Sequence, residues 1–357
     1  MTGGVRVPQG LKWSCGGCAA CCRNGFDLGP VEPEVIADLE ESAIGTLWAP
    51  AAEGFAEARQ GPDGEVSYFL KQTGGACVFL RDDDRCAVHA ILGGHRKPGF
   101  CREFPYHFVQ DLRGWTAIIR ADCGGFHRSF REAEPVGGPE VAEVLELPRV
   151  VPRRTFAPVT VTAFGTPVPL VAWLGWEDAL EASLLAAPTL QPGPAFGLVR
   201  EALASLVGVT PDPRTPDRAR IAAQACLLAL EHVLTQVAQQ PGPPERVAFV
   251  RHMVGRLREA RERTVAPCPE VSPELAAYLH LLLRSHLLAR MWQPHAPEAG
   301  IGAFALGLGV GMALAAEPTP ESFDGPYREW LRLSANPVIT AIFRKATPAL
   351  VDLLVHV

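Results

Sequence analysis

The chain has 357 residues, of which 48% are hydrophobic and 20% are charged, and its formal net charge is −6. This apolar content suffices for a hydrophobic core and excludes disorder over most of the chain, and the length predicts about two domains. Residues 1–130 carry 13 Lys/Arg against 16 Asp/Glu, and residues 131–357 carry 20 against 23, so neither part has the basic excess typical of nucleic-acid-binding proteins.

The cysteines are concentrated near the N-terminus. Eight of the ten lie within the first 123 residues, whereas Cys226 and Cys268 lie far from them. Residues 1–13 lack the long apolar run and the small-residue cleavage site of a secretory signal, so we expect a cytoplasmic protein. In a reducing compartment, clustered thiols favour metal or redox chemistry over disulfides.

Residues 1–130 predict a loop-rich, Cys-rich module with little regular core. A short amphipathic helix is expected over Val31–Ser42, because its apolar residues share one side. Short strands are expected at Val66–Leu70, Cys77–Leu80 and Trp115–Ile119, with turns at Lys71–Gly75 and Arg81–Arg85. A module with so little regular core needs an additional stabilising element. Under reducing conditions, where disulfides are unlikely, a bound metal can supply it.

Residues 131–172 predict a connector with a β-hairpin, in which strands at Val159–Phe164 and Val168–Ala172 flank a turn at Gly165. Residues 173–357 predict a helical domain. Its expected helices are Glu177–Ala187, Ala195–Leu206, Asp217–Gln239, Arg246–Arg263, Pro273–Met291, Ile301–Ala316, Glu321–Leu333 and Val338–Val357. Pro348 should kink the last of these or divide it in two. The expected fold class is mainly α: a small irregular α+β module followed by an all-α domain.

One uncharged segment, Ala299–Ala316, is long enough to reach the lower limit of a membrane-spanning helix. It contains a Gly-x-x-x-Gly pair, Gly307 and Gly311, which allows close approach of helices. Its composition is rich in Ala and Gly, and no aromatic belt or basic flank accompanies it. We therefore interpret it as a buried helix of a soluble core, with a membrane-spanning helix as the alternative.

The densest cysteine run is Cys15-Gly-Gly-Cys18-Ala-Ala-Cys21-Cys22. On a helix, Cys15, Cys18 and Cys22 would share one face, whereas in a loop Cys15, Cys18 and Cys21 could surround one cluster. The side chains of the adjacent Cys21 and Cys22 are expected to diverge, so that both do not bind the same ion. One of the two would then face a second metal, a cluster partner or the core.

Four further cysteines are too far apart for one local loop and must converge through the fold. The eight candidate ligands are Cys15, Cys18, Cys21, Cys22, Cys77, Cys86, Cys101 and Cys123. They could form two four-coordinate sites, or one four-cysteine cluster with cysteines to spare. The compact Cys-x2-Cys-x2-Cys spacing favours an iron–sulfur cluster, of the 4Fe–4S type, over zinc, and structural zinc is the alternative. His89, three residues after Cys86, is a further ligand candidate with a structural role as its alternative.

Four motifs occur in order: CGGCAACCR at 15–23, CVFL at 77–80, RCAVH at 85–89 and RKPGFCREFP at 96–105. Together they resemble the YkgJ-type cysteine-cluster family of zinc- or iron-chelating domains. The resemblance covers roughly residues 12–125 and includes the Phe104-Pro105 pair. The chain departs from the family pattern at Lys97-Pro98, where that pattern has Arg-Pro.

The architecture is also similar to that of flagellin lysine N-methylase, in which a Cys-rich module precedes a long helical region. Cys123, after a predicted strand, lies where those proteins carry a further cysteine. This resemblance implies an iron–sulfur-dependent methyl transfer to protein lysines, with the helical domain contacting a protein substrate or partner. The other functions left open are a structural-zinc interaction protein and metal delivery or storage. The chain has no phosphate-binding loop, dinucleotide fingerprint, zinc-protease motif or serine-hydrolase elbow.

Overall fold

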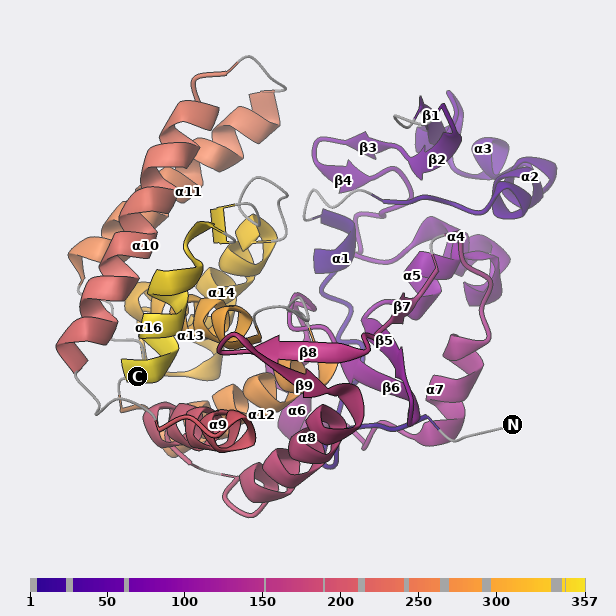
Figure 1. The fold of residues 1–357 in the computed structure, drawn as a ribbon. Coiled ribbons are helices and arrows are strands. Elements are labelled where there is room, and N and C mark those ends of the chain that lie inside the picture. The colour runs from indigo at the N-terminus through magenta and orange to yellow at the C-terminus, as the bar shows by residue number, and fades with distance from the viewer. Residues whose placement is uncertain are drawn as a thin grey trace. The chain divides into compact units, whose positions relative to one another are not determined.

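The computed structural model describes residues 5–23, 28–60, 64–150, 152–188, 190–210, 216–240, 244–263, 270–290, 297–334, 342–343 and 345–356. The chain divides into two compact units, Met1–Phe156 and Ala157–Val357. The first is a small α+β unit and the second is helical apart from one hairpin (Figure 1). The connector expected over 131–172 is thus shared between the two units.

The N-terminal unit is built from short elements. Its helices are α1 (Ala20–Arg23), α2 (Pro33–Glu41), α3 (Ile44–Leu47), α4 (Ala87–Leu92), α5 (Gly99–Glu103), α6 (Phe126–Glu132) and α7 (Gly138–Leu145), with 3₁₀ turns at Ala49–Ala51 and Gly94–Arg96. Its strands are β1 (Ala56–Gln60), β2 (Val66–Leu70), β3 (Gln72–Thr73), β4 (Ala76–Cys77), β5 (Tyr106–Asp111), β6 (Gly114–Ile119) and β7 (Arg154–Thr155).

Three sheets organise this unit. β1 and β2 form an antiparallel hairpin, as do β3 and β4. β5 pairs with β6 in antiparallel register, with Tyr106 opposite Ile119, and β7 adds to the other edge of β5 in parallel. β7 comes after α7, so this pairing returns the chain from α7 to the central strand β5.

Several predictions for this unit are confirmed. α2 lies within the predicted Val31–Ser42, β2 matches its prediction, and β6 begins one residue early. The predicted strand at Cys77–Leu80 is wrong beyond Cys77, because Val78 and Phe79 lie in a turn. Both are buried in a cluster with Leu39 and Ile44, so their apolar character serves the core and not a sheet ladder. α7 was not predicted, because Pro and Gly dominate its surroundings.

The second unit starts with the hairpin β8 (Thr160–Ala163) and β9 (Thr166–Pro169), in which Ala163 lies opposite Thr166. The hairpin prediction is confirmed, but its second strand ends early because α8 starts at Leu170. The helices are α8 (Leu170–Leu185), α9 (Pro192–Val207), α10 (Pro216–Val237), α11 (Pro244–Glu262), α12 (Pro273–Ala289), α13 (Pro297–Leu314), α14 (Pro320–Ser334) and α16 (Thr347–His356). α10 and α11 lie side by side, and α13 packs against both α14 and α16 (Figure 1).

The predicted helices are found at their positions, except where residues lie outside the described part of the chain. This applies to much of the N-terminal half of Val338–Val357, whereas α16 begins next to Pro348, as a break there predicts. α8 begins seven residues before its predicted start at Glu177. The sequence predicted a strand up to Ala172, where α8 has already begun. Trp173 and Trp176 follow in the helix and are buried, and this packing outweighs the local strand preference.

α13 is long and apolar enough to cross a membrane, and 78% of that segment is buried inside the structure. Its glycines explain the burial. A Cβ atom on Gly302 would overlap the carbonyl oxygen of Leu350 in α16, and one on Gly307 would overlap the Trp330 indole in α14. A Cβ on Gly311 would come within 2.6 Å of Phe323. The glycines of α13 therefore allow it to pack closely against neighbouring helices of the same unit.

Candidate metal centre

Five of the eight candidate cysteines line one cavity in the N-terminal unit. They are Cys21, Cys22, Cys77, Cys86 and Cys101, and the cavity has a volume of about 450 Å³. They come from α1, β4, the residue before α4, and α5. Thiols separated by up to 80 positions in the chain are therefore brought together by the fold, as their spacing required.

The buried apolar cluster of this unit contains or contacts three of the cavity cysteines. Cys77 belongs to the buried cluster of Leu39, Ile44, Phe79 and their neighbours, and Cys22 and Cys86 pack against that cluster. The backbone N–H of Ala87 donates to the carbonyl of Phe79, which fixes the start of α4 next to β4. The sulfurs thus lie where a hydrophobic core meets a cavity, and water has limited access there.

Gly99 allows α5 to approach the rest of the unit closely. A Cβ atom at this position would lie 2.5 Å from a carboxylate oxygen of Glu32 and 2.5 Å from the carbonyl oxygen of Pro148. The Gly99 N–H donates to Glu32 over 3.2 Å. A side chain would push α5 away, so glycine at this position keeps Cys101 in the cavity wall.

The sulfurs of Cys21 and Cys22 lie 3.8 Å apart, so the expected divergence of these side chains is wrong. Ligands of one tetrahedral metal with bonds of about 2.3 Å have nearly the same separation, about 3.8 Å. Adjacent positions on a helix do point about 100° apart, but rotation about χ1 brings the two sulfurs together. Of the two arrangements considered for the cysteine run, the shared helical face of Cys15, Cys18 and Cys22 does not form, because α1 begins only at Ala20.

Burial and the charges of neighbouring thiolates favour the neutral form of Cys77 and Cys101. Burial raises the pKa of Cys77 to about 11 and that of Cys101 well above its usual value, and the nearby Lys97 ammonium lowers both. Charges on Cys77, Cys86 and Cys21 would further raise the pKa of Cys101. A metal cation supplies the positive charge that lets several such thiols ionise together, with release of protons.

The remaining three cysteines form a separate group. Burial raises the pKa of Cys123 to about 11, the Gly125 backbone and the Trp13 indole lower it, and charges on Cys18 and Cys15 raise it. Gly125 lies against the backbone of Ser14 and Gly16, which brings the segment after β6 to the first cysteines. The N-terminal cysteine run is therefore shared between two groups of thiols, which its spacing did not predict.

Within the described residues, no three Cys, His, Asp or Glu side chains already stand in an arrangement that holds a metal ion. The donor set nevertheless fits a soft metal, because the cavity wall offers five sulfurs on a rigid apolar support.

Comparison with known protein families agrees with this donor set. Residues 14–123 match the CxxCxxCC family. Its description reads "Putative zinc- or iron-chelating domain". The matched segment contains both groups of thiols, so metal chelation is the function that the comparison supports for this part of the chain. No curated protein and no solved structure matches the chain. The similarity to flagellin lysine N-methylase stays a prediction from architecture.

The wall of the five-thiol cavity also contains a set of basic side chains that the sequence analysis did not predict. The cations are Lys97, Arg120, Arg149, Arg153 and Arg154, and the carboxylate among the described lining residues is Glu103. Three of the arginines follow α7, outside the matched segment. The Arg-Val-Val-Pro-Arg-Arg run at 149–154 was a visible signal, but nothing in the sequence placed it near the cysteines.

Other candidate ligands lie elsewhere. His89 is exposed in α4 and is not part of the cavity wall. The Asp82–Asp84 turn is exposed, with Asp84 paired to Arg23 and Asp83 to Arg81. Cys226 is buried in α10, where burial raises the pKa of its thiol to about 11. Cys268 lies outside the described residues.

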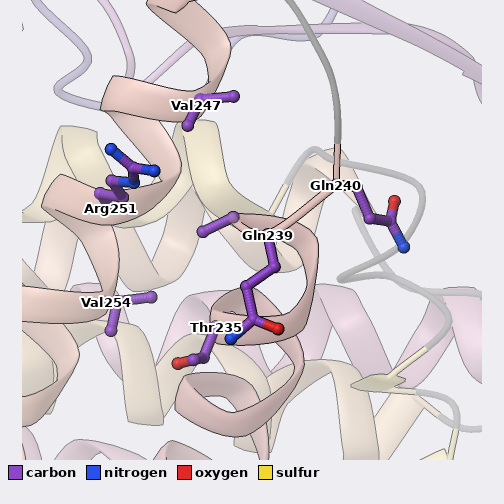
Figure 2. Close-up of a pocket in the computed structure, with 7 residues that line it drawn as sticks. Thr235, Gln239, Gln240, Val247, Arg251 and Val254 are labelled. Atoms are coloured by element: carbon purple, nitrogen blue, oxygen red, sulfur yellow. The ribbon is translucent and has the colours of Figure 1, made fainter.

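A second cavity, of about 580 Å³, lies in the helical unit (Figure 2). Thr235 of α10 and Gln239, in the turn after α10, face Val247, Arg251 and Val254 of α11 across it. The described residues of its wall include no cysteine, histidine or carboxylate. It does not offer the thiol donors of the cavity in the N-terminal unit.

Proposed function

We propose that this protein binds an iron–sulfur cluster in the cavity of its N-terminal unit, with cysteine thiolates from the five-thiol set as ligands. One observation carries the proposal: Cys21, Cys22, Cys77, Cys86 and Cys101 line a single cavity of about 450 Å³. A cluster of the 4Fe–4S type takes four thiolates. One of the five cysteines is therefore not needed as a ligand. Because Cys21 and Cys22 are adjacent, either of them can serve as the fourth ligand.

The size of the cavity supports a cluster over a single zinc ion. Structural zinc sites are closed, with four ligands at about 2.0–2.3 Å from the metal and no open space beside it. Here the thiols belong to the wall of a much larger space, which a polynuclear centre fills better. Lys97 lies near enough to lower the pKa of Cys21, Cys77 and Cys101, although other effects raise each of them. Its ammonium would offset part of the negative charge of a thiolate-ligated centre.

When bound, such a cluster supplies one-electron chemistry, with a potential set by its surroundings. The chain's own residues hold the thiols and line the same cavity with apolar and cationic side chains. Phe79 and Val88 are among the apolar residues, and the backbone of Gly29 also lines the space.

Anaerobic purification followed by a visible spectrum and analysis of iron, sulfide and zinc tests the proposal. We expect a brown protein with near-stoichiometric iron and sulfide. Cys101→Ser should lose the cluster, whereas Cys226→Ser, which removes a buried thiol of the helical unit, should keep it. Cys123→Ser should also retain it, because Cys123 belongs to the other thiol group. A colourless protein that holds zinc would overturn the cluster and favour structural zinc.

A further inference from the structure

The cavity of the N-terminal unit is larger than its thiols need, and its wall also carries basic side chains. Five cationic side chains line it against one carboxylate, Glu103, among the described residues. Arg120 is neutralised by Asp122, with contacts of 3.0 and 2.5 Å. The excess positive charge therefore does not come mainly from Arg120.

Arg149 and Arg153 share a single counter-charge. Arg149 Nη1 lies 2.9 Å from one oxygen of Glu103, and Arg153 Nε lies 2.9 Å from the other. Two guanidinium groups around one carboxylate leave a net positive charge in a site where all three side chains are mostly buried, at 22%, 13% and 10% exposure. Such a charge attracts a further anion more strongly than an exposed one would.

Arg153 is held rigidly in this arrangement. Its Nη2 donates to the carbonyl oxygens of Val144 and Leu147 at 3.0 and 3.2 Å, at the end of α7. Its guanidinium also lies over the Phe108 ring, 5.3 Å from the ring centre. Arg153 therefore fixes the position of Glu103.

The guanidinium of Arg149 has N–H donors that Glu103 does not engage. Within the described part of the chain its polar partner is Glu103, which engages one of the guanidinium nitrogens. A guanidinium offers five N–H donors in a planar fork that matches the oxygens of a carboxylate or a phosphate. Arg149 is therefore the group whose remaining donors can receive a ligand.

Aromatic side chains complete the same space. Phe100, Phe104, Tyr106 and Phe108 line the cavity, and the rings of Tyr106 and Phe108 lie 6.2 Å apart. Cavities of about 300–1,000 Å³ with mostly apolar walls and a few placed charges are typical of small-molecule sites. The combination favours a ligand with one anionic group and a flat or apolar body.

We infer that the cavity holds a second ligand beside the metal centre, an organic anion whose carboxylate or phosphate binds Arg149 and whose apolar body lies against the aromatic wall. This inference rests on the proposed function for the thiols of the cavity. It adds the chemical class of a second ligand, and the binding of the two ligands can be tested separately.

Calorimetric titration of the purified protein, with its metal content measured in each sample, tests the inference. The probes are adenosine 5′-monophosphate, benzoate and inorganic phosphate. The first two compare a phosphate with a carboxylate on an aromatic body, and inorganic phosphate shows what the anionic group contributes without that body. We expect at least one aromatic anion to bind, and inorganic phosphate to bind more weakly. Arg149→Gln should weaken that binding about ten- to hundredfold, because hydrogen bonds to charged groups are strong.

Two further variants make the result specific. Arg120→Gln removes a cation from the same wall that Asp122 already neutralises, and we expect less than a threefold change. Glu103→Gln removes the carboxylate that competes for both guanidiniums and should tighten binding of the anion.

The outcomes separate the two ideas. No binding of any probe, equal losses in the Arg149 and Arg120 variants, or loss of metal in Arg149→Gln would each overturn the second-ligand site. In the last case the arginine would serve the metal centre itself. A protein that lacks metal but binds the anion through Arg149 would contradict the proposed function and support the site.

Discussion

The two units of this protein are stabilised in different ways. In the N-terminal unit the longest helix has 9 residues and the longest strands have 6, and its thiols lie at the edge of a small apolar cluster. In the helical unit, helices of up to 22 residues bury a continuous core. A unit made of short elements buries little apolar surface for each residue it orders, so a metal contributes more to its stability.

The units also differ in how they use small residues. Gly99 in the first unit allows one short helix to carry a thiol into a cavity wall. Gly302, Gly307 and Gly311 in α13 allow whole helices to pack closely. Glycine positions a functional group in one unit and builds the core in the other.

The strongest test of this comparison is removal of the metal. Treatment with EDTA and ferricyanide should expose β5 and β6 to hydrogen exchange and leave α12 and α13 protected. A structural metal can contribute on the order of 10 kcal/mol, which exceeds the stability expected of a small loop-rich unit. Equal protection of the N-terminal unit before and after treatment would show that it does not depend on a metal.

The helical unit should instead depend on its buried ion pair. The Arg290 side chain is fully buried and contacts both oxygens of Glu177 at 2.7 and 2.6 Å. Glu177→Gln keeps the shape but leaves the guanidinium without its counter-charge, at a cost of about 3 kcal/mol. Urea unfolding followed by far-UV circular dichroism measures the loss. Asp217→Asn, at an exposed pair with Arg220, is the control and should leave the midpoint unchanged.

Close packing of α13 gives a somewhat smaller effect. Gly302→Ala places a methyl group against the Leu350 backbone, which can move only with α16, so we expect a loss of about 2 kcal/mol. Gly255→Ala, with open space around it in α11, should instead stabilise the unit by about 0.5–1 kcal/mol. Both variants should keep the wild-type metal content. A destabilisation by Gly255→Ala equal to that of Gly302→Ala would contradict the packing argument.

Acid should weaken the helical unit through two histidines of α12. Burial lowers the pKa of His280 to about 4, with a further contribution from Arg284, and burial lowers that of His286 to about 3. In the unfolded chain both titrate near pH 6.5, so the unfolded state binds more protons below that pH. Stability is therefore fully present above pH 6.5 and falls towards pH 4, by at most about 1.4 kcal/mol per pH unit for each histidine.

Melting temperatures measured between pH 4 and 7 check this expectation. His286 stacks on Phe304 with ring centres 4.3 Å apart, so His286→Phe conserves an aromatic ring and removes the titration. This variant should show a flatter pH profile than the wild type. An unchanged profile would show that His286 does not contribute to acid sensitivity.

The sequence by itself determined the parts of this protein that depend on local pattern. The spacing of apolar residues from residue 173 onward predicted the helices. This spacing and the Pro and Gly residues between helices are local properties of the sequence. The ordered cysteine motifs predicted a metal-chelating segment, which the family comparison supports. The Ala/Gly composition of Ala299–Ala316 favoured a core helix, and the packing of α13 agrees.

The tertiary structure alone decided how distant residues combine. It divides the cysteines into a group of five and a group of three, and it brings the sulfurs of Cys21 and Cys22 together. It also returns the chain after α7 to the cavity, so that Arg149 and Arg153 surround Glu103. These arrangements depend on strand pairing and side-chain rotation over long sequence separations, which local spacing does not encode.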